Sequence, residues 1–244
     1  HIFTFIGIFF RLVGQAKRER PGAVVLIDYP GFNLLFALMM YRHRIPVIWY
    51  VCPHLWVWGK WRLPVLAKIC TKMLVIFPFE TEVFAHTKLR TEFVGHPLID
   101  IVADRRIPGI ERNPEDFLLL PGSRTMEINF LLYPMLDTVT ELAKRHPELK
   151  FHLSAPREKI ARLCREKFAA YRRKHPDVPE VEITCGDTSF WQQRAGTGLA
   201  ASGTVTVESA IAGLPLVVGY KLNWITILMA SLVVKLYRGF FTRW

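Results

Sequence analysis

The chain has 244 residues, of which 51% are hydrophobic, so it can bury a sizeable core and general disorder is excluded. Its formal net charge of +11 favours anionic partners such as phosphates, nucleic acid or an acidic membrane surface, although dispersed Lys and Arg side chains can equally serve solubility. The four cysteines have neither metal-ligand spacing nor a disulfide framework, which fits a reducing compartment.

The first half alternates between helical and strand-like segments. Bulky apolar residues at helical spacing over 2–15, with a basic end, predict a helix that could lie in a membrane interface or pack against another part of the domain. Strands are expected at 23–27, 45–51, 72–77 and 92–94, and helices at 34–41, 62–71 and near 78–80.

A charged stretch broken by prolines and a glycine predicts a linker at 106–115, between a first domain at 1–105 and a second at 116–244. The second half repeats the alternation, with strands at 117–120, 151–155, 181–185, 198–201 and 216–220 and a helix at 157–175. This pattern predicts an α/β protein with two Rossmann-like parallel sheets covered by helices on both faces. Both ends look cut, so we expect both domains to be incomplete. Ligands of such folds bind at the carboxyl ends of strands.

The segment Phe117-Leu-Leu-Leu-Pro-Gly-Ser-Arg124 predicts a strand, a glycine turn and the start of a helix. Gly122 allows close approach of a ligand, the helix N-terminus favours an anion, and Arg124 suits a phosphate. An ordinary strand-to-helix turn with a solvated arginine is the alternative.

A similar turn, Ala201-Ser-Gly-Thr204, joins a strand to a helix that carries Glu208. Ser202 can cap this helix, Gly203 permits a close approach, and Glu208 could accept both hydroxyls of a ribose. A plain helix cap with a solvated glutamate is the alternative. Two such turns on one sheet favour a nucleotide site.

In the first half, Asp28 ends an apolar strand, where a carboxylate could act as a general base or simply cap the next helix. His54 and His96 are further candidates for proton transfer, and Trp56 could line an apolar or sugar-binding wall or plug the core. There is no Walker A sequence, no full dinucleotide fingerprint, no Asp-x-Asp pair and no zinc spacing. The helix dipole and Arg124 would therefore stabilise a leaving diphosphate without a metal.

Several motifs occur in a characteristic order: Leu26-Ile-Asp28-Tyr-Pro-Gly-Phe-Asn33, Tyr50-Val-Cys-Pro-His-Leu-Trp-Val-Trp58, Phe79-Glu80, Val94-Gly-His-Pro97, Leu120-Pro-Gly-Ser-Arg124 with Glu127, Leu199-Ala-Ala-Ser-Gly-Thr204 with Glu208, and Val218-Gly-Tyr-Lys221. Together they resemble the lipid-A-disaccharide synthase family along essentially the whole chain. The resemblance implies a two-domain GT-B glycosyltransferase of family 19 that inverts the anomeric centre and needs neither a metal nor another cofactor.

The implied substrates are UDP-2,3-diacylglucosamine and 2,3-diacylglucosamine 1-phosphate, which form a β-1,6-linked disaccharide and UDP. The family acts at the cytoplasmic face of the inner membrane as a peripheral enzyme, and the full-length protein is expected to form a homodimer. No nucleic-acid partner is expected, because the chain lacks a recognition motif.

By this resemblance, Asp28 takes the proton of the acceptor's 6-hydroxyl. The expected nucleotide-binding residues are Gly122, Ser123, Arg124, Glu127, Ser202, Gly203, Thr204 and Glu208. The expected substrate-binding residues are Asn33, His54, Trp56 and His96. We also expect Asp28 and Arg124 to share one cavity.

The chain departs from the family pattern at Gly31, where the family usually has Asp, and it lacks the Gly-Glu-x-Ser-Gly-Asp and Leu-Pro-Asn segments and the C-terminal helices. Two alternatives therefore stay open. One is a related GT-B transferase with another UDP-sugar, and the other is an inactive fragment that binds UDP or membranes.

Overall fold

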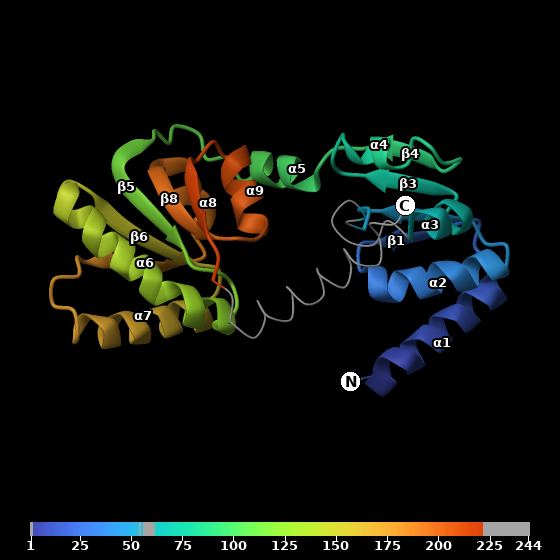
Figure 1. Cartoon of the computed structure of the whole chain (residues 1–244), viewed down its shortest axis with the longest axis horizontal. Helices are drawn as coiled ribbons and strands as arrows, with labels where there is room; N and C mark the ends of the chain where they lie inside the picture. The colour runs from blue at the N-terminus through green and yellow to red at the C-terminus, as the bar shows by residue number, and fades with distance from the viewer. Residues whose placement is uncertain (1, 54, 56–61, 222–244) are drawn as a thin grey trace, which may run out of the picture. The chain divides into compact units, whose positions relative to one another are not determined.

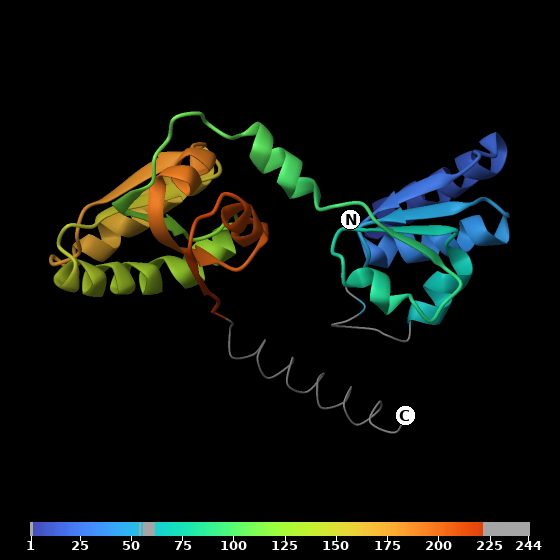
Figure 2. The same cartoon turned by 90° about the horizontal axis from the view of Figure 1, so that it is seen from above.

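A computed structural model of the chain describes residues 2–53, 55 and 62–221. The chain divides into two compact units between Pro97 and Leu98, and each unit contains its own parallel sheet. In Figures 1 and 2 the first unit is coloured blue to teal and the second green to red. The predicted α/β class with two parallel sheets is confirmed.

The first unit contains a sheet with the order β1-β2-β3-β4. Its strands are β1 Val24–Ile27, β2 Val47–Tyr50, β3 Lys72–Val75 and β4 Arg90–Phe93, and its helices are α1 Ile2–Glu19, α2 Pro30–Arg42, α3 Leu63–Ile69 and α4 Glu80–Val83. The helix expected at 34–41 begins earlier, because Pro30 suits the first helical turn. Helix α1 also extends beyond the predicted end at residue 15.

One face of the first sheet holds the core of this unit. Val47, Trp49 and Met73 are buried among residues of α1, α2 and α3. Helices α1 and α2 lie side by side (Figure 1). They pack together through Phe9, whose ring meets that of Phe32 edge to face, with centroids 5.5 Å apart. On the other face, Val25 and Ile27 of β1 are exposed by 58% and 61%. Among the residues that the structure describes, no helix therefore covers this side of β1, although the sequence predicts helices on both faces of each sheet.

The second unit contains a sheet with the order β7-β6-β5-β8-β9, in which every pairing is parallel. Its strands are β5 Asn113–Leu120, β6 Lys150–Ala155, β7 Val181–Cys185, β8 Ala195–Ala201 and β9 Leu216–Gly219. Its helices are α5 Pro97–Asp104, α6 Thr125–Arg145, α7 Glu158–Arg172, α8 Thr188–Arg194 and α9 Thr204–Ile211. Strand β5 begins inside the predicted linker, and the predicted domain boundary at 106–115 stays a prediction.

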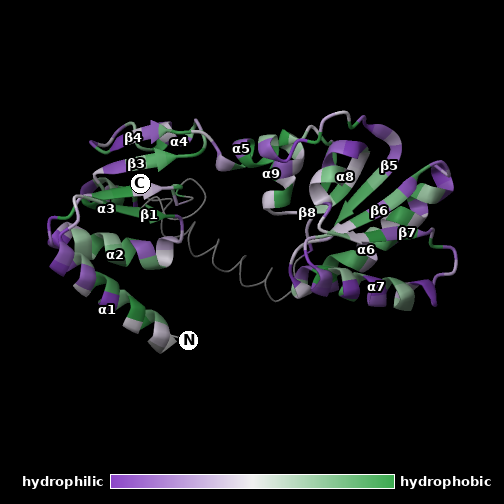
Figure 3. Ribbon diagram, turned by 180° about the vertical axis from the view of Figure 1, so that it is seen from behind, coloured by the Kyte–Doolittle hydropathy of each residue, from purple (hydrophilic) through white to green (hydrophobic). Residues whose placement is uncertain are grey.

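Both faces of this second sheet are covered. Phe117 and Leu119 of β5 face α6 and α7, whereas Leu118 and Leu120 face Trp191 of α8 and its neighbours. Successive side chains of a strand point to opposite faces, so a continuous apolar run is what a sheet buried on both sides requires. Figure 3 shows this distribution, with apolar strands in green and hydrophilic purple residues on the outer helices.

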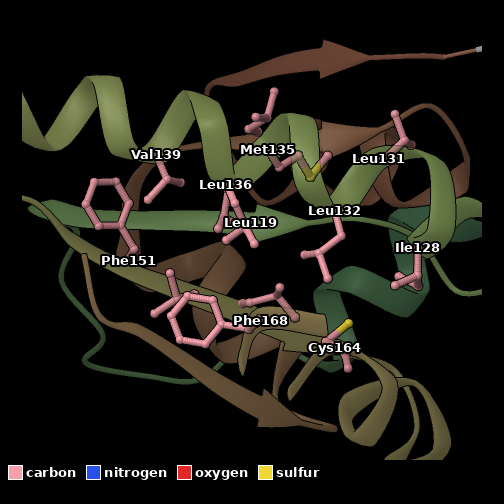
Figure 4. Close-up of a cluster of buried hydrophobic side chains, with 14 of the residues drawn as sticks. Leu119, Ile128, Leu131, Leu132, Met135, Leu136, Val139, Phe151, Cys164 and Phe168 are labelled. Atoms are coloured by element: carbon pink, nitrogen blue, oxygen red, sulfur yellow. The ribbon is translucent and has the colours of Figure 1, made fainter. Parts of the chain in front are cut away.

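The larger core cluster lies between β5 and the two long helices. In Figure 4, side chains from α6 (Leu132, Leu136) lie over Leu119, while Cys164 and Phe168 reach in from α7. Leu119, Leu132, Leu136 and Cys164 have no solvent exposure. Burial raises the pKa of the Cys164 thiol to about 11, so this cysteine is a packed apolar group at neutral pH.

Candidate functional site

A cleft of about 880 Å³ lies at the carboxyl edge of the second sheet. It is lined by Arg105, Leu120, Gly122, Ser123, Arg124, Glu127, Ser154, Pro156, Gly186, Thr188, Ser189, Ala201, Ser202, Gly203, Thr204, Val205 and Glu208. All eight residues that the sequence assigned to a nucleotide therefore surround one cavity. They come from two turns that are far apart in the chain, after β5 and after β8.

The turn after β5 is held by a carboxylate of its own helix. Glu127 Oε2 accepts hydrogen bonds from the backbone N–H of Ser123 at 2.8 Å and of Arg124 at 3.2 Å. Gly122 has φ +121°, and a Cβ there would come within 2.5 Å of Glu127 Oε2. The glycine is thus required by the backbone conformation and by Glu127, in addition to the ligand approach expected from the sequence.

Arg124 provides the exposed cation of this turn. Its side chain is 78% exposed, and Nη1 lies 3.4 Å from Glu127 Oε1, a long contact that leaves the guanidinium able to turn to an anion. A second arginine supports this turn, because Arg157, directly before α7, donates a hydrogen bond from Nη2 to the Ser123 carbonyl oxygen at 3.1 Å. The expected free N–H groups are therefore partly used, since those of Ser123 and Arg124 bond to Glu127.

The turn after β8 differs from its prediction in one detail. Gly203, and not Ser202, is the residue that precedes α9, and no side chain caps this helix. Ser202 instead donates its backbone N–H to Gly219 O at 3.3 Å. Its side chain therefore stays available at the cleft, where Thr204 and Glu208 also lie. Glu208 lies one turn into α9, as predicted.

Sequence reasoning missed one side of the cleft. Ser154 is the residue before the last of β6, Gly186 lies in the turn after β7, and Thr188 and Ser189 begin α8. Arg105, which follows α5, also lines the cleft. Both strands were predicted, and the turn Gly186-Asp187 directly follows one of them. The rule that ligands bind at the carboxyl ends of parallel strands could have identified this turn.

In the first unit, the residues after β1 adopt an unusual backbone conformation. Asp28 and Tyr29 have φ of +46° and +42°, and Val51, directly after β2, has +64°. Such values are costly for residues with a Cβ and cluster at functional sites in proteins. Tyr29, and not Asp28, precedes α2, so Asp28 does not cap that helix. Its side chain is exposed.

Asn33 fixes the position of Asp28. Its amide Nδ2 donates to the carbonyl oxygens of Ile27 at 3.0 Å and Asp28 at 2.6 Å. Asn33 is 9% exposed, so its amide satisfies these carbonyl groups at the end of β1 from the interior of the unit. A substrate contact at Asn33 stays a prediction, and its bonds already give it a role in orienting Asp28.

Three predicted residues of the first unit remain. His96 lies in the loop before α5 and packs against Phe77, with ring centroids 5.3 Å apart. His54 and Trp56 lie outside the described residues. Their expected roles, and that of His96, stay predictions.

Glu80, the first residue of α4, belongs to a motif of the resemblance but was given no chemical role from the sequence. Glu80 is 1% exposed, and its Oε2 accepts hydrogen bonds from the backbone N–H of Ile76 at 3.1 Å and of Phe77 at 2.9 Å. Burial, and secondarily the Glu80 carboxylate, raises the pKa of the Cys52 thiol. Glu80 therefore stabilises the turn after β3, and Cys52 is a packed thiol.

Within the described part of the chain, no three His, Cys, Asp or Glu side chains are grouped as metal ligands would be. The same residues contain no helix with the length and hydropathy needed to cross a bilayer.

Solved structures with a similar fold are UDP-sugar enzymes. The chain aligns with a putative UDP-N-acetylglucosamine 2-epimerase from Listeria monocytogenes, with a TM-score of 0.62, 12% identity and coverage of 90% of this chain and 62% of that one. It also aligns with the UDP-GlcNAc 2-epimerase from Neisseria meningitidis bound to UDP-GlcNAc, with a TM-score of 0.58, 14% identity and coverage of 90% and 65%. At these identities the likeness shows the fold alone, which is GT-B-like.

Proteins with a similar sequence identify the family, whereas the solved structures show only the fold. The chain is 34% identical over 233 residues to the lipid-A-disaccharide synthase of Anaeromyxobacter sp. (strain K), covering 93% of this chain and 60% of the relative. It is 32% identical over 235 residues to that of Syntrophus aciditrophicus (strain SB), with the same coverage. The chain thus spans about 60% of the length of these curated relatives. The family model of lipid-A-disaccharide synthetase matches residues 1–238, and the chain therefore belongs to this family.

Proposed function

We propose that this chain carries the reacting centre of a glycosyltransferase that joins UDP-2,3-diacylglucosamine to 2,3-diacylglucosamine 1-phosphate. The products would be lipid A disaccharide 1-phosphate and UDP. The observation that carries the proposal is the gathering of all eight predicted nucleotide residues around one cleft of the second unit. Membership of the lipid-A-disaccharide synthetase family supports the substrates.

In the proposed reaction, the cleft holds the nucleotide. Arg124 pairs with the diphosphate, and the dipole of the long helix α6 adds to its positive charge. Glu208 accepts the ribose hydroxyls, because a carboxylate suits two adjacent O–H donors and repels phosphate. These groups stabilise the charge that develops on the leaving UDP, so the proposed mechanism needs no metal.

Asp28 is the proposed general base. The acceptor's 6-hydroxyl oxygen attacks the anomeric carbon while its proton passes to the Asp28 carboxylate. The bond from the anomeric carbon to the diphosphate breaks, and UDP leaves with the electron pair. A single displacement of this kind inverts the anomeric centre. The exposure of Asp28 and the restraint of its backbone by Asn33 support this role.

The surface of α1 supports a peripheral membrane location for the acylated substrates. Phe5 and Phe10 are exposed by 50% and 66%, and the last turn carries Lys17 and Arg18. Exposed aromatic residues next to cations suit the interface of an anionic bilayer. The same proposal includes a location at the cytoplasmic face of the inner membrane and a homodimeric state.

Product formation tests the proposal directly. The chain is incubated with both substrates in detergent micelles, and disaccharide is followed by mass spectrometry. We expect product from the parent and a loss of roughly 10²–10⁴-fold for Asp28→Asn, which keeps the shape but removes the base. The control is Glu82→Gln, which alters an exposed carboxylate of α4 and should leave the rate unchanged.

Other outcomes separate the alternatives. A chain that binds UDP in a calorimeter but forms no product would be a nucleotide-binding fragment. Equal rates for the parent and Asp28→Asn would contradict the role of Asp28 as the base.

A further inference from the structure

Asp187 precedes α8 directly, yet its side chain does not cap that helix. Its carboxylate turns back to the sheet, where Oδ1 accepts hydrogen bonds from Ser154 Oγ at 2.7 Å and Thr184 Oγ1 at 2.8 Å. Oδ2 accepts one from Trp191 Nε1 at 2.9 Å. The three donors belong to β6, β7 and α8, so a single carboxylate connects three elements.

The tryptophan of this group is itself fixed in the core. Trp191 stacks on His152, with ring centroids 3.7 Å apart. His152 lies between two carboxylates, with Nδ1 2.9 Å from Glu182 Oε2 and Nε2 3.1 Å from Asp116 Oδ1. Asp187 therefore connects the turn after β7 to a buried polar network, and such networks restrict local motion when their members are paired.

The neighbours of Asp187 line the cleft, although Asp187 itself does not. Gly186, Thr188 and Ser189 form this part of the wall, together with Ser154, which also bonds to Thr188 Oγ1 at 2.9 Å. These four residues are small and uncharged, and the cations of the cleft lining are Arg124 and, after α5, Arg105. A diphosphate would find no cation among the four, whereas hydroxyl and backbone groups suit the polar edge of a nucleobase.

We propose that Asp187 is a positioning residue that holds the segment Gly186–Ser189, which is the turn after β7 and the start of α8, as the nucleoside-facing wall of the cleft. The assignment rests on the nucleotide binding proposed above. It separates two parts of one site, with the turn of Arg124 for the diphosphate and the turn fixed by Asp187 for the nucleoside.

Calorimetry with two probes distinguishes these parts. The full 244-residue chain is titrated with UDP and with inorganic pyrophosphate. In Asp187→Asn the amide nitrogen cannot accept a hydrogen bond, so at least one donor loses its partner. We expect UDP affinity to fall about tenfold and pyrophosphate affinity to stay within about twofold of the parent.

Two further variants complete the design. Asp177→Asn removes an exposed carboxylate elsewhere in the second unit and should leave both affinities unchanged. Thr184→Val removes one donor while keeping the side-chain volume, and it should weaken UDP alone by about threefold. If Asp187→Asn fails to fold, Thr184→Val provides the test instead.

The inference is overturned if Asp187→Asn binds UDP as the parent does, or if it loses UDP and pyrophosphate to the same extent. The second result would indicate a general structural role. A parent chain that does not bind UDP would overturn the nucleotide assignment itself and this inference with it. A parent that binds UDP, with Asp187→Asn unaffected, would overturn the role of Asp187 alone.

Discussion

The carboxyl edges of the two sheets are built differently. After β5 and β7 of the second sheet, the positive φ values of +121° and +81° belong to Gly122 and Gly186. After β1 and β2 of the first sheet, they belong to Asp28, Tyr29 and Val51. Glycine adopts this conformation without strain, whereas a residue with a Cβ is destabilised by about 1–2 kcal/mol. The first edge therefore stores strain at the proposed base, whereas the turns of the second edge adopt their positive φ values without strain.

The sheets also differ in how they are buried. In β5 of the second sheet, five consecutive residues from Asp116 to Leu120 are buried, whereas in β1 of the first sheet only Leu26 is. A parallel sheet is ordinarily covered on both faces, so the exposed Val25 and Ile27 are unusual. From this difference we expect a core substitution in the second sheet to destabilise its unit far more than a substitution on the exposed face of β1 destabilises the first.

The largest expected effect tests this difference in burial. Leu132→Ala removes a fully buried side chain from the core between α6 and β5 and should lower the free energy of unfolding of the second unit by about 2–5 kcal/mol. Val25→Ala, on the exposed face of β1, should change the free energy of unfolding of the first unit by no more than about 0.5 kcal/mol. Urea unfolding followed by hydrogen exchange reports each unit separately. Equal losses would contradict the contrast between the sheets.

A smaller effect tests the contrast between the turns. Gly122→Ala places a Cβ within 2.5 Å of Glu127 Oε2 at positive φ, so we expect a loss of about 1–3 kcal/mol in stability. Tyr29→Gly relieves the left-handed conformation of an exposed residue and should leave stability unchanged or raise it by up to about 1 kcal/mol. Thermal unfolding measures both variants. Stabilisation by Gly122→Ala would contradict the positive φ of Gly122 and its close approach to Glu127.

Much of this arrangement could be predicted from sequence. Apolar runs ending in Pro-Gly or Ser-Gly identified the strands and turns that surround the cleft, because glycine marks close approach and positive φ. Arg124 and Glu208 were found in the same way. These signals are local, and the parallel topology brings them to one edge.

Other features depend on contacts that no local pattern reveals. The turn at Asp28 and Tyr29 contains no glycine, so its left-handed backbone could not be predicted. The carboxylate of Asp187 could have capped α8, and only the tertiary structure turns it to Ser154 and Trp191. Likewise, the apolar sequence of β1 predicts a strand that is buried on both faces. Its actual burial depends on which elements pack against it, and the local sequence does not show this.

The central claim is that the cleft of the second unit binds the nucleotide through Arg124. The most direct measurement is the dissociation constant of UDP for the parent chain, Arg124→Ala and the control Arg162→Ala, an exposed arginine of α7 outside the cleft. A charge-assisted contact to phosphate predicts roughly 10–100-fold weaker binding for Arg124→Ala and no change for the control. Equal UDP affinities for all three proteins would contradict the account.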